Sequence, residues 1–84
     1  MTLSENTKLT KDIVGRRFPT LDKLKKKIEM TLNRKIQTII ESESEKEEEE
    51  LDFMINYCFE DDPENIETLY YLKDNSGWYY ITGV

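Results

Sequence analysis

Apolar residues follow two different periods along the chain. Between residues 21 and 41 they recur every three or four positions, and lysines and an arginine occupy the positions between them. This spacing places the apolar side chains on one stripe of a helix. Thr20 is a favourable N-cap, and Asp22 lies in the first turn, where the helix dipole favours an anion. The pattern therefore predicts an amphipathic helix over about residues 21–41.

After residue 50 the period changes to two. The apolar members of this alternation are Leu51, Phe53, Ile55, Tyr57 and Phe59. Such alternation is typical of a half-buried strand. Turn-forming residues at 61–65 and 74–77 separate this segment from two further apolar segments. We therefore expect three antiparallel strands in a meander, at about 51–60, 66–73 and 78–84.

The last turn, Asp74-Asn75-Ser76-Gly77, sets the register of the C-terminal hairpin. Aspartate first and glycine fourth suit a type I turn that closes with a left-handed glycine bulge, which places Asp74 opposite Trp78. Because side chains alternate between the faces of a sheet, this register assigns every residue of the hairpin to a face. One face carries Glu67, Leu69, Tyr71, Lys73, Tyr79 and Ile81. The other carries Ile66, Thr68, Tyr70, Leu72, Trp78, Tyr80, Thr82 and Val84.

The segments outside these elements are polar. Residues 1–12 predict a flexible tail, and residues 13–18 a short strand or an extended arm. Residues 42–50 are rich in glutamates that repel one another, which predicts an acidic loop. The predicted fold class is therefore α+β: one amphipathic helix packed on a three-stranded antiparallel β-meander, with a flexible or extended N-terminal arm. Residues 13–84 would form a single domain.

Charge divides the chain into two halves. Residues 1–41 carry ten basic and five acidic residues, whereas residues 42–84 carry two and thirteen, and the two halves together give the net charge of −6. Such asymmetry points to an interaction surface, although two oppositely charged halves also attract each other within one fold.

The residue types needed for common catalytic chemistry are scarce. The chain has no histidine, and Cys58 is its single cysteine, so this thiol has no imidazole to activate it. The three glycines are scattered and form no phosphate-binding loop. The acidic turn at 61–64 offers oxygen ligands, but its spacing matches no calcium loop. We expect a protein that is not an enzyme and has no catalytic, cofactor or metal site.

Location is inferred from what the sequence lacks. No run of apolar residues has the length of a membrane helix or of a signal peptide. A single cysteine excludes the internal disulfides that small secreted domains commonly need. The sequence therefore predicts a cytoplasmic location and no membrane partner.

The hairpin has more apolar surface than one helix covers. We expect the face with Leu69, Tyr71, Tyr79 and Ile81 to stay exposed and to supply the anchors of a protein interface. We expect an acidic group to steer a basic partner toward it, namely Glu47, Glu48, Glu49 and Glu50. The predicted function is a non-enzymatic accessory subunit, regulator or inhibitor that binds another protein or a second copy of itself. Residues 9–18 folding back over this face would remove the need for a partner.

Nucleic-acid binding is the alternative. It would use the basic residues of the arm and the helix to contact phosphates, namely Arg16, Arg17, Lys23, Lys26, Lys27 and Arg34. These residues are separate in sequence from the aromatic strands on which bases would stack. The net charge of −6 also opposes attraction to a polyanion. Direct nucleic-acid binding is therefore the less favoured prediction.

Overall fold

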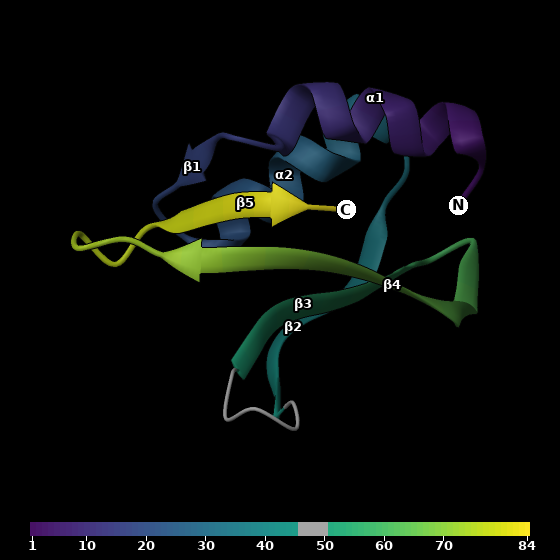
Figure 1. Cartoon of the computed structure of the whole chain (residues 1–84). Coiled ribbons are helices and arrows are strands. Elements are labelled where there is room, and N and C mark those ends of the chain that lie inside the picture. Colours follow the sequence, from purple (N-terminus) through teal and green to yellow (C-terminus); the bar gives the residue numbers. More distant parts are fainter. Residues whose placement is uncertain (46–50) are drawn as a thin grey trace.

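The computed structural model describes the backbone of residues 1–45 and 51–84 and the side chains of residues 1–42 and 53–84. Figure 1 shows a layer of two helices packed on an antiparallel sheet. In chain order the elements are α1 (Leu3–Ile13), β1 (Arg17–Phe18), α2 (Leu21–Leu32), β2 (Ile36–Glu45), β3 (Leu51–Phe59), β4 (Asp62–Lys73) and β5 (Tyr79–Gly83). The strand order across the sheet is β1-β5-β4-β3-β2, and each neighbouring pair is antiparallel. The α+β class is therefore confirmed, but the described sheet has five strands where three were predicted.

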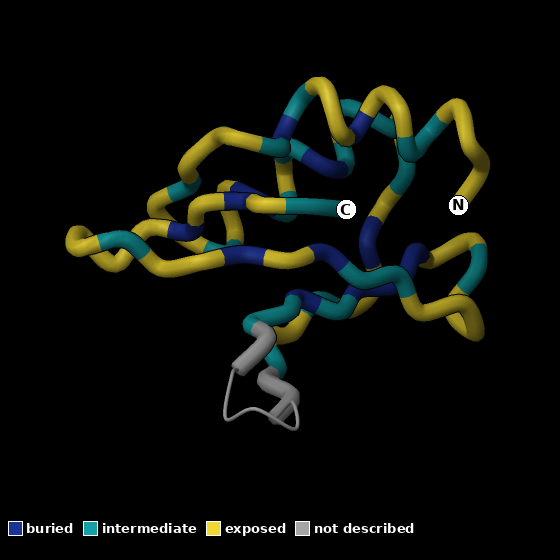
Figure 2. The backbone as a smooth tube through the Cα atoms, in the orientation of Figure 1, coloured by how far each residue is buried: buried dark blue, intermediate teal, exposed yellow. Residues whose placement is uncertain are grey.

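Both helices lie against the same face of the sheet, which we call the inner face (Figure 1). The core between the two layers contains Leu9, Ile13, Leu24, Ile28, Ile36, Ile55, Tyr57, Phe59, Leu69, Tyr71, Tyr79 and Ile81. Figure 2 shows buried positions alternating with exposed ones in β4 from Leu69 onward and at the start of β5. On the opposite face of the sheet, the outer face, no helix of the described residues is packed.

The N-terminal segment forms helix α1, so the prediction of a flexible tail over residues 1–12 is wrong. A capping box starts the helix: Thr2 Oγ1 accepts from the Glu5 N–H, and the Glu5 carboxylate accepts from the Thr2 N–H, each at 3.1 Å. Leu9 and Ile13, four residues apart on one side of the helix, are completely buried. These two side chains pack α1 against the core. The segment is otherwise polar, so two apolar residues were too few to predict a helix from the sequence.

Helix α2 begins after Thr20 as predicted but ends at Leu32, not near residue 41. Asn33, in the left-handed region with φ 53°, terminates it. The chain then continues as strand β2, and a bulge at Gln37 places Ile36 and Ile39 on the same face although they are three residues apart. That spacing resembles a helical repeat, which is why the sequence pattern extended the helix too far. The prediction of an acidic loop over residues 42–50 is wrong for residues 42–45, which belong to β2, whereas residues 46–50 lie outside the described part of the chain.

The C-terminal meander follows the prediction more closely. Gly77 has φ 80°, and its N–H donates to the Asp74 carbonyl at 2.9 Å, which confirms the predicted turn. The pairs Lys73–Tyr79 and Tyr71–Ile81 confirm the predicted register up to that point. An extra residue in β5 then shifts the pairing and leaves Val84 packed against the core, not on the outer face.

Candidate protein-binding surface

The four residues predicted as partner anchors lie in the core. Leu69 and Ile81 are 0% exposed, Tyr71 is 4% exposed and Tyr79 is 8% exposed. The Tyr79 hydroxyl also donates a hydrogen bond to the Glu41 carboxylate. The expected exposure of this face is therefore wrong, because α1 and α2 together cover it. The predicted two-sided character of the hairpin remains, but the uncovered face is the other one.

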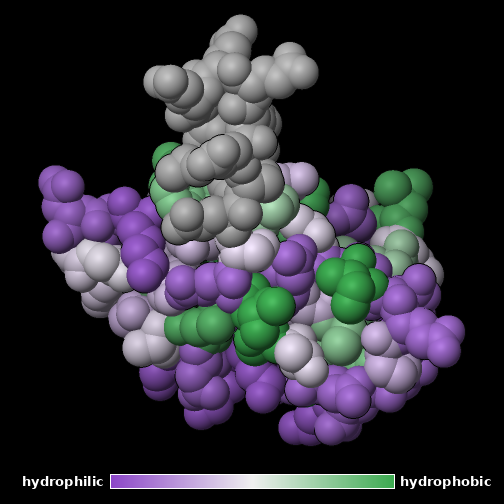
Figure 3. All heavy atoms as spheres, turned by 90° about the horizontal axis from the view of Figure 1, so that it is seen from below, coloured by the Kyte–Doolittle hydropathy of each residue, from purple (hydrophilic) through white to green (hydrophobic). Residues whose placement is uncertain are grey.

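Large apolar side chains are exposed on the outer face. We name six of them the outer patch: Ile40, Ile66, Tyr70, Leu72, Trp78 and Tyr80, with exposed fractions of 53, 63, 43, 53, 39 and 39%. They belong to β2, β4, β5 and the turn before β5. Figure 3 shows hydrophobic side chains in the middle of the molecule seen from below, with hydrophilic ones around them. A group of this kind on a folded domain usually marks a site of interaction.

A row of polar side chains crosses the middle of the outer face. Thr68 Oγ1 donates to Asn56 Oδ1 at 2.9 Å, and Asn56 Nδ2 donates to Ser42 Oγ at 2.8 Å. The three residues come from three adjacent strands and are partly buried. Cross-strand hydrogen bonds of this kind fix side-chain orientation. These central polar side chains of the outer face are therefore hydrogen-bonded to one another.

A shallow hollow of about 230 Å³ lies beside this row. Its lining comes from β2, β3 and β4: Thr38, Ile40, Asn56, Tyr57, Cys58 and Ile66. Two of these residues, Ile40 and Ile66, belong to the outer patch. The hollow is therefore an apolar depression that adjoins the outer patch.

The hairpin end of the patch is held by Arg17 and Asp74. Arg17 Nε donates to Asp74 Oδ2 at 2.5 Å, and the guanidinium carbon lies 4.9 Å from the centroid of the Trp78 ring. Asp74 Oδ1 accepts from the backbone N–H groups of Ser76 and Trp78. Although desolvation opposes it, these hydrogen bonds hold the pKa of Asp74 below its usual value. Arg17 and Asp74 together therefore contact both the ring and the backbone of Trp78.

Arg34, one of the six candidate phosphate contacts, is engaged inside the protein. Its guanidinium donates to Glu5 Oε2 at 3.0 Å and to Asp61 Oδ1 at 2.6 Å, and it lies 3.8 Å from the centroid of the Phe59 ring. Its side chain is only 20% exposed. Arg34 therefore links α1 to the turn between β3 and β4.

The two carboxylates that Arg34 joins have lowered pKa values. Arg34 lowers the pKa of Asp61 through its hydrogen bond to that carboxylate. The pKa of Glu5 is lowered mainly by the hydrogen bond from the Thr2 N–H. Partial burial opposes this shift, and Arg34 adds to it. Because the usual values are 3.8 and 4.5, the ionised carboxylates stabilise the fold above about pH 4.5, and this contribution is lost as the pH falls through the lower folded-state values.

Replacing Arg34 should therefore reduce the loss of folding stability that occurs when the pH is lowered. We expect Arg34→Gln to lower the urea midpoint at pH 7 and to flatten its decline below pH 4.5. The control is Lys35→Gln, which removes the same charge from the adjacent exposed position. If the urea midpoints of the two variants depended on pH in the same way, Arg34 would not be what lowers the pKa values of these carboxylates.

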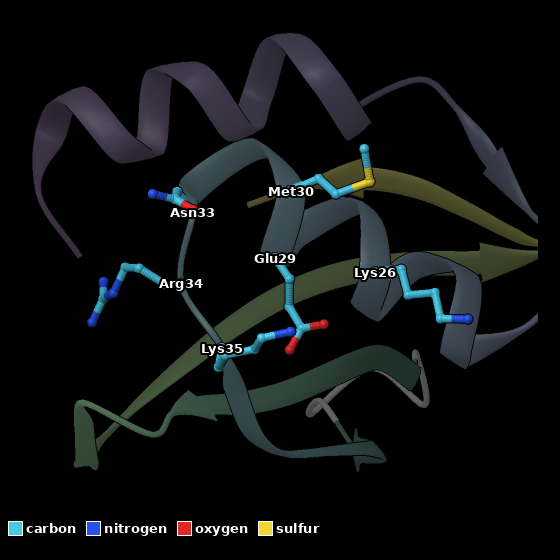
Figure 4. A pocket seen from close by; sticks show the side chains of 6 residues that line it. All are labelled: Lys26, Glu29, Met30, Asn33, Arg34 and Lys35. Carbon is cyan, nitrogen blue, oxygen red and sulfur yellow. The ribbon is translucent and has the colours of Figure 1, made fainter.

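Two of the six basic candidates, Lys26 and Arg34, share a groove but do not converge within it. Lys26 and Arg34 line a groove of about 420 Å³ at the end of α2, together with Glu29, Met30, Asn33 and Lys35. Figure 4 shows the charged ends of Lys26 and Arg34 pointing in opposite directions, with Lys35 beside the Glu29 carboxylate. Lys26 Nζ also lies 3.3 Å from Asp22 Oδ2. The groove therefore does not gather its cations around a single anion.

Potential reactive groups are shielded. Cys58 is 6% exposed, and the buried Tyr57 hydroxyl has no hydrogen-bond partner among the described residues. Burial raises the pKa of Tyr57, which disfavours proton transfer at neutral pH. Among the side chains of residues 1–42 and 53–84 no three histidine, cysteine, aspartate or glutamate residues are grouped as metal ligands would be. Neither α1 nor α2 has the length and apolar composition that crossing a lipid bilayer requires.

The predicted acidic steering group, Glu47 to Glu50, lies outside the described residues. Comparison with known proteins adds no further candidate. The chain matches no protein-family model, no curated protein and no solved structure.

Proposed function

We propose that this protein is a non-enzymatic binding protein that docks on another protein through its outer patch. The observation that carries the proposal is the exposure of six large apolar side chains on a sheet face that neither α1 nor α2 covers. Aromatic and aliphatic residues of this kind supply most of the binding energy at protein interfaces. The internally bonded polar row beside them favours a preformed surface that binds without reorganisation.

The charges near the outer patch indicate the kind of partner. Glu60 lies at the β3–β4 turn, and Asp62 and Glu64 lie in the first part of β4, close in sequence to Ile66. At the other end, the positive charge of Arg17 is balanced by Asp74. We infer a partner with a projecting apolar side chain for the hollow and basic residues around it. The glutamates at 47–50 would add to this attraction through long-range electrostatics.

Two double variants separate the outer patch from exposed apolar residues elsewhere. Tyr70→Ser with Leu72→Ser changes the outer patch. Leu3→Ser with Met30→Ser changes two side chains of α1 and α2 that are 82% and 78% exposed. Each immobilised protein would be incubated with extract of the source cells, retained proteins identified by mass spectrometry, and the Kd of each purified candidate measured.

The proposal expects a partner that the wild type and the helix variant retain and the sheet variant loses. The Kd should rise by about 30-fold or more, because two anchor residues typically contribute 1 kcal/mol or more each. Circular dichroism should show all three proteins folded. A partner that binds the sheet variant as tightly as the wild type would contradict the proposal.

The nucleic-acid alternative has weaker support. Three of its six candidate contacts, Arg17, Lys26 and Arg34, are paired with carboxylates. It nevertheless predicts retention of an oligonucleotide at low salt and a steep loss of affinity as salt increases. A mobility-shift assay tests this directly, and a retained complex would favour the alternative.

A further inference from the structure

Helix α2 carries a row of exposed or partly exposed side chains on the side that does not face the core. We call this row the lysine stripe: Lys23, Lys26, Lys27 and Met30. Positions i, i+3, i+4 and i+7 share one side of a helix, and Figure 4 shows two members of the row, Lys26 and Met30. Because α2 packs on the inner face, the sheet separates the lysine stripe from the outer patch.

The positive charge of the lysine stripe is poorly balanced within the chain. Lys26 Nζ lies 3.3 Å from Asp22 Oδ2, but the two side chains are 63% and 65% exposed, and such surface pairs contribute little. No carboxylate of the described residues pairs with Lys23 or Lys27. These two lysines, four positions apart, repel each other, and Lys23 lies in the first turn, where the helix dipole disfavours a cation. An anionic surface beside the stripe would relieve both effects.

The residue types of the helices restrict the kind of anionic partner. Neither α1 nor α2 contains an aromatic residue on which a base could stack. The lysine stripe also lacks the asparagine or glutamine that reads adenine. It contains an apolar side chain instead, since Met30 is 78% exposed. Lysines together with a projecting apolar side chain are typical of contact with anionic lipids.

We propose that the lysine stripe docks this protein on the surface of a membrane that contains anionic lipids. The lysine ammonium groups contact the headgroups, and Met30 enters the boundary between headgroups and acyl chains. The expectation of no membrane partner rested on the absence of a spanning segment, and contact with the surface requires none. The inference goes beyond the proposed function, because the outer patch lies on the far face of the sheet and stays available to a protein partner.

The net charge of −6 does not prevent this contact. Residues 1–35, which include both helices, carry ten basic and four acidic residues. At physiological ionic strength, exposed charges separated by more than about 8 Å are largely screened from each other. The charges beside the stripe therefore outweigh the net charge of the whole chain.

Co-sedimentation with lipid vesicles tests the proposal. The wild type should pellet with vesicles made of equal amounts of phosphatidylserine and phosphatidylcholine, and not with phosphatidylcholine alone. Added salt should weaken the binding. A stripe variant should have a partition coefficient about 100-fold lower, because each lysine near an anionic surface adds to the attraction. Its three substitutions are Lys23→Gln, Lys26→Gln and Lys27→Gln.

A matched control removes the same charge elsewhere. Lys8→Gln, Lys11→Gln and Lys35→Gln change three exposed positions outside the lysine stripe. This control variant should bind the vesicles nearly as well as the wild type, and circular dichroism should show both triple variants folded. Equal losses in the two variants would reduce the effect to net charge and overturn the proposal. A wild type that stays in the supernatant would overturn it as well.

Two further variants separate the contributions. Met30→Ser should lower the partition coefficient by about tenfold, because it removes the inserted apolar side chain. The Tyr70→Ser and Leu72→Ser double variant should bind vesicles as the wild type does, so loss of partner binding and loss of membrane binding are distinguishable. If the wild type ignores vesicles but retains an oligonucleotide that the stripe variant releases, the stripe binds nucleic acid and the membrane proposal is wrong.

Discussion

Leu69→Ala should lower the free energy of unfolding by about 2–5 kcal/mol, whereas Leu72→Ala should change it by at most about 0.5 kcal/mol. The two leucines lie three residues apart in β4 and lose the same atoms. Leu69 is completely buried between the sheet and the helices, and Leu72 is 53% exposed on the outer face. The difference therefore reports which face of the sheet the helices cover.

Urea denaturation followed by circular dichroism measures both variants. A chain of this length has an expected total stability of about 4–13 kcal/mol, so the Leu69 variant should lose a large part of it. A larger loss of unfolding free energy for Leu72→Ala would mean that the assignment of the faces is reversed. Equal losses for the two variants would contradict the assignment as well.

The second large effect is expected in α1. Leu9→Ala combined with Ile13→Ala should destabilise the protein by about 4–8 kcal/mol, because two fully buried side chains are truncated in one cluster. That loss approaches the whole stability of the domain, so the double variant should be largely unfolded at room temperature.

A matched change outside the core is available in the same helix. Leu3→Ala removes an apolar side chain that is 82% exposed and should leave the urea midpoint nearly unchanged. If the double variant at positions 9 and 13 stays as stable as this control, α1 is not part of the core and the segment behaves as the tail that its composition suggests.

The local signals in the sequence predicted the C-terminal half well. A strict period of two marked β3, and the residue types at 74–77 specified the turn and the pairing around it. These features depend on residues that are close in the sequence, and they could therefore be predicted from it. The helix α1 and the strand β2 depend on distant contacts, because the burial of Leu9 and the pairing of β2 with β3 are not encoded in any short segment.

The candidate surface shows the same division. The sequence predicted that the hairpin is apolar on both faces, and the exposure of Tyr70 and Tyr80 beside the buried Tyr71 and Tyr79 agrees with this. The sequence did not predict which face of the hairpin the helices cover, because both faces contain aromatic residues at similar positions. Helix α1, formed by the N-terminal segment, packs together with α2 on the face that had been expected to bind a partner.

Oxidative footprinting of the five tyrosines by mass spectrometry tests the central claim most directly. In the free protein, Tyr70 and Tyr80 should be modified rapidly, while Tyr57, Tyr71 and Tyr79 should be slow, and addition of the captured partner should protect only the first two. Rapid modification of Tyr71 and Tyr79, or unchanged rates at Tyr70 and Tyr80 in the complex, would contradict the assignment of the outer patch as the binding surface.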